Sequence, residues 1–339
     1  MATRISVCIP THNRAGLLQQ ALRSFMELRP MPTRNWEIII VANRCEDHTV
    51  RLAKSMAAQL PVPLLVVEEA KPGVVAARNC AARYAHGEII AFLDDDVQVC
   101  PDWLSELIKV FDTDPPDIFV GRVSLDWHGL AKPPWFDSGM GQYLAEVNLG
   151  DIPIFLRTAM GATANLAITR TMLERVGKFR CPLLRRGQRT AGEDTDLIAR
   201  ALRLDGKVLY CPTAVVRHHV AQERLTIRYL CSVAYDVGLA EYLIAPPPRS
   251  GELLLNLAKK NSRFLTRLVR WLVIRPFHHR SAAQLRVSLA KTRGNIRGLV
   301  LCAAGTMRRD RDNASRIGHG VSIPTTEITA DEFGTHRRG

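Results

Sequence analysis

Short apolar runs and amphipathic segments alternate along residues 5–217 of the chain. Most apolar runs are followed by a polar loop and then by a segment with helical periodicity. The runs that we expect to be strands are 5–10, 36–42, 64–67, 89–93, 118–125, 162–169, 207–210 and 214–217. The segments that we expect to be helices are 15–28, 50–60, 74–85, 102–111, 170–176 and 197–204. This alternation predicts an α/β fold with a mostly parallel central sheet and helices on both of its faces.

Residues 126–160 break this pattern, because they are rich in aromatic residues, Pro and Gly and have no regular periodicity. A loop of this length in a compact domain is usually functional or disordered. Aromatic rings such as Trp127, Trp135 and Tyr143 favour stacking on sugars or bases. A loop that simply packs on the domain is the other interpretation.

The charge of the chain is concentrated near its end. Residues 249–339 carry 18 basic and 6 acidic residues, whereas residues 1–248 carry 28 and 27. Residues 253–274 have the pattern of an amphipathic helix that Pro276 ends. Its polar arc consists of Asn256, Lys259, Lys260, Arg263, Arg267 and Arg270. A basic stripe, a wide apolar face and a Trp favour a helix that lies on an anionic membrane surface. The alternative is a helix whose apolar face packs on the rest of the protein.

The remaining composition is that of a reduced globular protein. The eight cysteines are scattered without close pairs, which favours free thiols and a cytoplasmic location. We see no signal-peptide pattern at the first residues and no apolar run of 18 residues. We therefore expect a cytoplasmic protein, with peripheral attachment to the inner face of the plasma membrane through residues 253–274, and a disordered tail over residues 306–339.

Three carboxylates, Asp94, Asp95 and Asp96, directly follow the apolar run 89–93. Like charges this close raise one another's pKa and need a compensating ion. Asp residues two apart on an extended segment point the same way, which suits a hard divalent cation. Open α/β sheets bind ligands at the carboxyl ends of their strands, so this position favours a ligand site over a solvated acidic turn.

A second acidic cluster, Glu193, Asp194 and Asp196, begins the helix that we expect over residues 197–204. Carboxylates in the first turn of a helix are also favoured by the helix dipole alone, so a functional and a structural interpretation both remain. His218 and His219 follow the last expected strand.

Several of these segments, taken in order, resemble the family-2 inverting glycosyltransferases, which are nucleotide-sugar-dependent enzymes of bacterial polysaccharide and glycan synthesis with the GT-A fold. The matching segments are 7–14, 37–47, 77–79, 87–96, 161–165 and 192–197. The resemblance implies a Rossmann-like catalytic domain over residues 1–245, with a nucleotide-binding half, 1–125, and an acceptor half, 126–245. A basic helical region would follow over residues 246–305.

The resemblance also implies roles for single residues. The triplet corresponds to the Asp-x-Asp motif, in which Asp96, together with Asp94, binds Mn2+ or Mg2+ at the donor diphosphate, and His218 or His219 completes the metal shell. Asp194 corresponds to the catalytic base, and Glu193 assists it. The residues expected to contact the nucleotide sugar are Pro10, Thr11, Asn13, Arg14, Asn43, Asp47, Arg78, Asn79, Asp94 and Asp95.

The chain departs from the family pattern in two places. Asn43 follows the second strand where many relatives have an acidic residue that reads the base, so the donor is expected to be linked to either UDP or GDP. The segment 222–225 lacks the Gln-x-x-Arg-Trp signature of processive synthases, which favours transfer of a single sugar to a glycan or lipid-linked acceptor.

Two alternatives belong to other classes. A nucleic-acid-binding protein would explain the basic C-terminal part but not the two acidic clusters, which repel phosphates unless a metal intervenes. A sugar nucleotidyltransferase would share the metal aspartates, but no Gly-rich phosphate loop with a downstream Lys follows the first strand.

Overall fold

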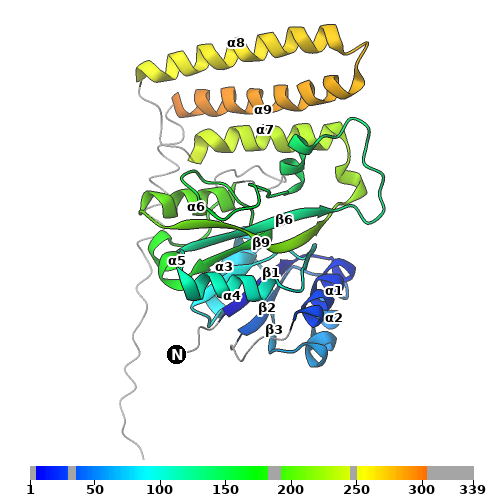
Figure 1. The fold of residues 1–339 in the computed structure, drawn as a ribbon, viewed down its shortest axis with the longest axis vertical. Helices are drawn as coiled ribbons and strands as arrows, with labels where there is room; N and C mark the ends of the chain where they lie inside the picture. Colours follow the sequence, from blue (N-terminus) through cyan, green and yellow to red (C-terminus); the bar gives the residue numbers. More distant parts are fainter. Residues whose placement is uncertain (1–4, 30–35, 182–191, 245–249, 304–339) are drawn as a thin grey trace, which may run out of the picture.

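The computed structural model describes residues 5–29, 36–181, 192–244 and 250–303 (Figure 1). Within these ranges a nine-stranded sheet has the order β3-β2-β1-β4-β8-β6-β9-β5, and β7 pairs with β9. The strands are β1 (Ile5–Thr11), β2 (Trp36–Asn43), β3 (Leu64–Glu69), β4 (Ile89–Phe92), β5 (Val97–Val99), β6 (Ile118–Asp126), β7 (Ile154–Phe155), β8 (Leu166–Thr169) and β9 (Val208–His219). The predicted α/β architecture is confirmed.

The sheet is mixed, with its parallel part at the N-terminal side. β3, β2, β1 and β4 run parallel, whereas β8 lies antiparallel between β4 and β6. The two strands expected over 207–210 and 214–217 form one strand, β9. Its pairing with β6 shifts between Gly121 and Arg122, opposite a segment that contains Pro212, which cannot donate to the ladder. The expected strand 162–169 begins instead with a 3-10 turn, η4 (Thr163–Asn165).

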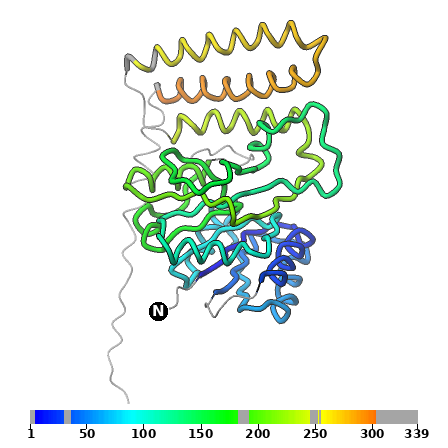
Figure 2. Tube along the Cα trace, viewed as in Figure 1, coloured from blue at the N-terminus to red at the C-terminus, as the bar shows by residue number. Residues whose placement is uncertain are grey.

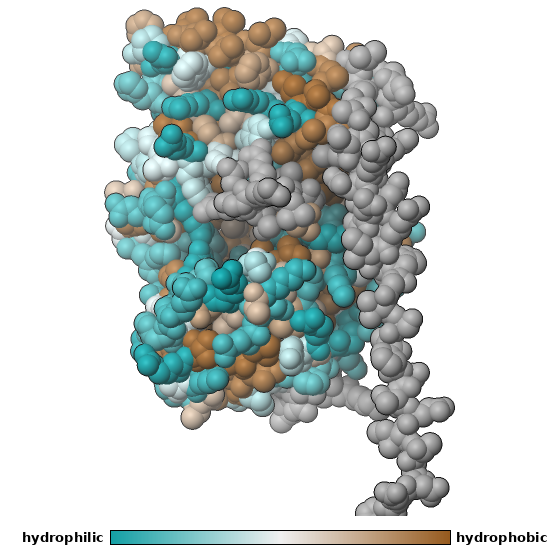
Figure 3. Space-filling model, turned by 180° about the vertical axis from the view of Figure 1, so that it is seen from behind, coloured by the Kyte–Doolittle hydropathy of each residue, from teal (hydrophilic) through white to brown (hydrophobic). Residues whose placement is uncertain are grey.

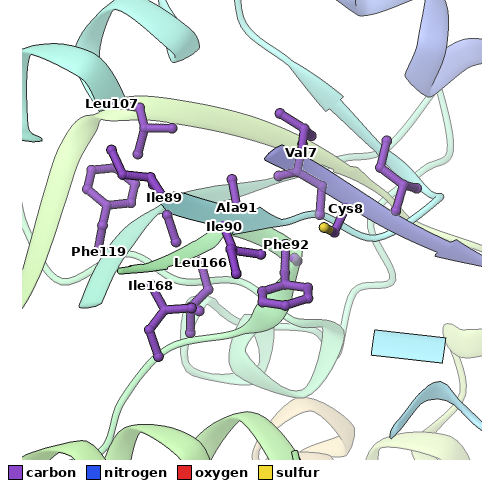
Figure 4. Close-up of a cluster of buried hydrophobic side chains, with 14 of the residues drawn as sticks. Val7, Cys8, Ile89, Ile90, Ala91, Phe92, Leu107, Phe119, Leu166 and Ile168 are labelled. Carbon is purple, nitrogen blue, oxygen red and sulfur yellow. The ribbon is translucent and has the colours of Figure 1, made fainter. Parts of the chain in front are cut away.

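Helices cover both faces of the parallel strands, since every residue of β1 and β4 is buried. The helices of this part are α1 (Ala15–Ser24), α2 (Thr49–Met56), α3 (Val74–Tyr84), α4 (Trp103–Thr113), α5 (Arg170–Val176) and α6 (Glu193–Arg203). Figure 4 shows apolar side chains of β1, β4, β6 and β8 packed together, among them Val7, Ile90, Phe119 and Ile168. The strand that precedes the aspartate triplet is thus fixed within the main core.

The irregular stretch 126–160 packs into a second, smaller core. It contains the 3-10 helix η3 (Ser138–Leu144), and its residues Phe136, Met140, Tyr143 and Leu144 are buried. They pack with side chains of α7 (Ile227–Ile244) and α9 (His279–Ala303). Trp127 and Trp135 are partly buried against the same cluster. Trp127, Trp135, Phe136 and Tyr143 therefore pack at the junction with the C-terminal helices, which supports the packing interpretation.

Three long helices, α7, α8 (Ser250–Ile274) and α9, are stacked on one side of the sheet domain (Figures 1 and 2). α9, which lies within the helical region expected over residues 246–305, is situated between α7 and α8 and contacts both. The backbones of α7 and α9 approach closely at glycines: a Cβ added to Gly294 would lie 2.1 Å from the carbonyl oxygen of Tyr235. None of the described helices has an apolar stretch of the length and hydropathy that a membrane span requires. The tail predicted over 306–339 lies outside the described residues.

Candidate functional site

A cavity of about 360 Å³ lies at the carboxyl ends of β1 and β2 and beside the loop that follows β4. Parallel strands bring their carboxyl ends to one edge of a sheet, so residues distant in sequence meet there. The wall also includes the first turns of α3, the start of α6, the end of β9 and the 3-10 turn η5 (Gln222–Arg224). The residues that line the cavity are Pro10, Thr11, His12, Arg14, Asn43, Val74, Ala77, Arg78, Asp94, Asp95, Asp96, Ala145, Glu193, His218 and Arg224.

Asp95 is held by the loop after β1. Thr11 Oγ1 donates to its carboxylate at 2.7 Å, and Arg14 Nη1 donates to it at 2.9 Å. Burial raises the pKa of Asp95 to about 6; Arg14 opposes this rise and the neighbouring Asp96 adds to it.

Of the three aspartates, Asp96 lies near the most basic side chains. Arg14 Nη1, Arg224 Nη2 and His218 Nε2 lie 3.1, 3.3 and 3.3 Å from its carboxylate oxygens. Burial alone would raise the pKa of Asp96, but the hydrogen bond from His218 and the charges of Arg224 and Arg14 hold it well below its usual range. These contacts favour the ionised form of Asp96.

Asp94 is joined to the second acidic cluster by a buried arginine. Arg78 donates to Asp94 Oδ1 at 2.9 Å through Nη2 and to Glu193 Oε1 at 2.7 Å through Nη1. Its guanidinium also lies 5.9 Å from the centre of the Phe179 ring. Asn79, which we expected at the nucleotide, binds both the N–H and the carbonyl of Phe179 and so fixes that ring beside Arg78.

Glu193 and Asp194 occupy the first turn of α6. Burial raises the pKa of both carboxyl groups, and the charge of Arg78 opposes that rise. Glu193 lines the cavity; Asp194, the expected base, is next to it but is not among the described residues of the wall. Asp194 Oδ1 accepts a 2.7 Å hydrogen bond from the backbone N–H of Thr195.

Several residues expected at the nucleotide also connect neighbouring loops. The side-chain amide of Asn43 donates to the carbonyls of Glu69 and Lys71 and accepts from the N–H of Gly73, although Asn43 also lines the cavity. Asn13 accepts from the N–H of Glu46 and Asp47. Asp47 binds Thr49 at the start of α2. Their contact with a nucleotide stays a prediction.

The two histidines at the end of β9 differ. Neither ring has a hydrogen-bond partner at Nδ1. His218 is buried and faces Asp96, whereas the ring of His219 packs on that of His128 with a centroid distance of 4.5 Å. In the described part of the chain no three His, Cys, Asp or Glu side chains are grouped as a metal site. Asp96 and His218 are a pair of donors that suits a divalent cation whose other ligands come from a bound diphosphate.

Sequence reasoning missed Arg224 and His12. Arg224 lies 128 positions after Asp96, in the segment that we set aside because it lacks the processive signature. Its only signal was a basic residue shortly after the last strand of the sheet. His12 Nδ1 lies 2.7 Å from the carbonyl oxygen of Asn43 and joins the first two loops of the edge.

Comparison with known proteins finds similarity to glycosyltransferases. Residues 6–133 match the model of glycosyl transferase family 2. The succinoglycan biosynthesis protein ExoM of Rhizobium meliloti is 26% identical over 237 residues, which cover 69% of this chain and 72% of ExoM. The glycosyltransferase AglE of Haloferax volcanii is 25% identical over 176 residues, 52% of this chain and 55% of AglE.

Solved structures show the same fold. The mannosyltransferase PcManGT from Pyrobaculum calidifontis, in complex with GDP-Man and Mn2+, has a TM-score of 0.55 at 18% identity. The match covers 94% of this chain and 81% of the PcManGT chain. TarS of S. aureus has a TM-score of 0.50 at 16% identity, over 69% of this chain and 39% of its own. The alternatives of a nucleic-acid-binding protein and a nucleotidyltransferase find no support in these matches. The family match over residues 6–133 includes the strands that carry Asp94, Asp95 and Asp96, so this part of the chain is a glycosyl transferase family 2 domain within a GT-A-type sheet.

Proposed function

We propose that the protein is a metal-dependent, inverting glycosyltransferase that moves one sugar from a nucleotide-diphosphate sugar to a hydroxyl of a glycan or lipid-linked acceptor. One observation carries this proposal: a strand-end aspartate triplet and the acidic start of α6 meet at one cavity and are joined by Arg78. The name of ExoM, a succinoglycan biosynthesis protein, supports a role in cell-surface polysaccharide synthesis.

The donor half of the cavity suits a diphosphate. Arg14 and Arg224 bring two guanidinium groups to the edge at which the strands end, and guanidinium binds phosphate oxygens in a forked geometry. Asp96 and His218 would hold Mn2+ or Mg2+, and a bound cation would stabilise the charge that develops on the leaving diphosphate. Two solved relatives support this, since PcManGT contains GDP-Man and Mn2+ and GalNAc-T7, with a TM-score of 0.50, contains UDP, GalNAc and Mn2+.

The start of α6 supplies the proton acceptor. A carboxylate base works best when its pKa is near the working pH, and burial raises the pKa of Asp194 in that direction. Asp194 would take the proton of the acceptor hydroxyl as its oxygen attacks the anomeric carbon opposite the diphosphate. A single displacement of this kind inverts the anomeric centre. Glu193, fixed by Arg78, would orient Asp194 and the acceptor.

The test is a panel of UDP- and GDP-linked sugars incubated with the protein and Mn2+, with release of nucleoside diphosphate as the measurement. We expect slow hydrolysis of one donor class. Release from no donor, together with no increase in Tm on addition of UDP or GDP, would contradict the proposal.

Three variants then assign the roles. We expect Asp194→Asn to keep nucleotide binding and to lose transfer by about 10²- to 10⁴-fold. Asp96→Asn should lose Mn2+-dependent nucleotide binding. Asp196→Asn is the matched control, because Asp196 belongs to the same helical turn but pairs with Arg200 at 2.8 Å. If Glu193→Gln loses transfer while Asp194→Asn keeps it, the base is Glu193.

A further inference from the structure

The two sides of α8 have different surroundings. One side is partly buried: Leu257, Phe264, Leu268 and Trp271 lie there at helical spacing. Lys260 Nζ on the same side donates to Asn295 Oδ1 of α9 at 3.2 Å, and Arg267 donates to Thr292 of α9. Two of the basic residues that the sequence placed on a lipid-facing stripe therefore face α9, and that part of the expectation is corrected.

The opposite side of α8, which we call the outer face, is exposed and apolar. Leu265, Val269, Leu272 and Val273 are 58%, 59%, 54% and 63% exposed. At 100° per residue these four positions fall within an arc of about 100°. Phe277, in the turn after the helix, is 76% exposed. Figure 3 shows hydrophobic surface gathered at this end of the molecule.

A row of exposed basic residues borders the outer face. Lys259, Arg263 and Arg270 are exposed and lie within about 40° of one another on the helix, beside the apolar arc. Residues 250–303, which form α8 and α9, contain eleven Lys or Arg and a single acidic residue, Glu252. An anionic surface complements this charge, whereas a second copy of the same face would repel it.

Rotating α8 about its axis would not bury the outer face without exposing the side that packs on α9. α8 already packs its partly buried side on α9, and α9 is held against α7 by close backbone contact at Gly238 and Gly294. The exposed apolar arc is therefore additional to the packing between α8 and α9. A helix with an apolar face, a basic border and no spanning length has the features of an interfacial helix.

We propose that the outer face of α8 docks the protein on an anionic lipid bilayer. The helix lies in the plane of the membrane, with Leu265, Val269 and Val273 in the boundary between headgroups and acyl chains. Lys259, Arg263 and Arg270 lie at the level of the anionic headgroups. This assignment is independent of the donor and acceptor proposed above.

The test is flotation of the full-length protein with vesicles of phosphatidylcholine alone or with added phosphatidylglycerol. We expect binding to the anionic vesicles and at least about tenfold weaker binding to the neutral ones. The triple variant Leu265→Asp, Val269→Asp, Val273→Asp should lose at least about tenfold in binding to the anionic vesicles. Its control places the same added charge elsewhere, at Met26→Asp, Ile152→Asp and Leu204→Asp, which are also exposed apolar positions.

A second variant separates charge from apolar contact. The preference for phosphatidylglycerol should be abolished in the triple variant Lys259→Gln, Arg263→Gln, Arg270→Gln. It should be kept in a control triple variant at exposed positions of α1 and α2, Arg23→Gln, Arg51→Gln, Lys54→Gln. Circular dichroism and Tm check that each variant is folded. Wild-type protein that floats with neither vesicle would overturn the proposal. A soluble dimer that the Asp variant dissociates, without vesicle binding, would identify a protein interface and overturn it as well.

Discussion

Arg78 and Glu193 are 115 residues apart in the sequence, and the guanidinium of one donates a 2.7 Å hydrogen bond to the carboxylate of the other. The same buried guanidinium binds Asp94, so one cation fixes the position of the donor side of the cavity relative to the start of α6. Removing one partner of a buried ion pair leaves the other charge uncompensated. The geometry of the site therefore depends on Arg78.

We expect Arg78→Met to lower the rate of donor turnover per folded molecule by at least about 100-fold and stability by about 3–5 kcal/mol. Steady-state kinetics and urea denaturation measure the two effects. Arg170→Met is the matched control, since Arg170 donates to the carbonyls of Ala85 and Gly87 and does not line the cavity. The control should lose stability and keep its rate. A normal rate in Arg78→Met would show that Arg78 serves stability alone.

Binding of Mn2+ should depend on the nucleotide, because Arg14 and Arg224 already neutralise Asp96. We expect weak binding of Mn2+ alone and at least about tenfold tighter binding with UDP or GDP, whose diphosphate competes for the guanidinium groups. Arg224→Gln should tighten binding of Mn2+ alone and reduce the effect of the nucleotide. Electron paramagnetic resonance of free Mn2+ measures both.

Arg217→Gln serves as the control for that experiment, because Arg217 is an exposed residue of β9 seven positions before Arg224 and does not line the cavity. It should behave as wild type. Equal Mn2+ affinity with and without nucleotide, in wild type and in Arg224→Gln, would show that the arginines do not compete with the cation for Asp96.

The parts of this site that sequence predicts are local ones. Asp94 and its neighbours were recognised because an apolar strand and a carboxylate triplet are adjacent in the chain. In an open α/β sheet the carboxyl ends of the strands form the edge that binds ligands, so the triplet was expected there. Partners could not be predicted in this way. Arg224 reaches Asp96 across 128 positions, and the amide of Asn43 is taken up by carbonyls whose direction only the fold sets.

The same distinction applies to α8. Its periodicity predicted a helix and an amphipathic pattern, and the structure confirms the helix. Which side of α8 is exposed depends on α9, whose residues have little amphipathic periodicity, so the sequence did not indicate how the two helices pack. Lys260 and Arg267, which the pattern placed on the basic stripe, therefore face α9, while Lys259 and Arg263 of the same stripe are exposed.

The stability of the protein should carry a pH dependence from Asp95, whose pKa in the folded state rises from 3.8 to about 6. The folded state then binds a proton between these pH values that the unfolded state does not, so the contribution of Asp95 to stability decreases as the pH rises from about 4 to about 6. Above pH 6 the free-energy cost of burying the ionised carboxylate of Asp95 is constant. Asp95→Asn removes the ionisation.

We therefore expect the stability of Asp95→Asn relative to wild type to increase by up to about 3 kcal/mol between pH 4 and pH 7. Urea denaturation at several pH values measures this difference. Asp117→Asn is the control, because Asp117 accepts a hydrogen bond from the N–H of Lys207 in an exposed turn. A difference that does not vary with pH would mean that Asp95 stays ionised in the folded protein.

Close packing between α7 and α9 should make Gly294 intolerant of even a methyl group. A Cβ at this position would lie 2.1 Å from the carbonyl oxygen of Tyr235, so the backbone of one helix must shift. Overpacking of this kind costs about 1–3 kcal/mol, and Gly294→Ala should lower Tm accordingly. Gly16→Ala is the matched control within α1, because no atom lies within 4 Å of its added Cβ. There Ala stabilises the helix by about 0.5–1 kcal/mol. If Gly294→Ala were as stable as Gly16→Ala, α9 could not lie against α7 at the observed distance, and the support beneath α8 would be lost.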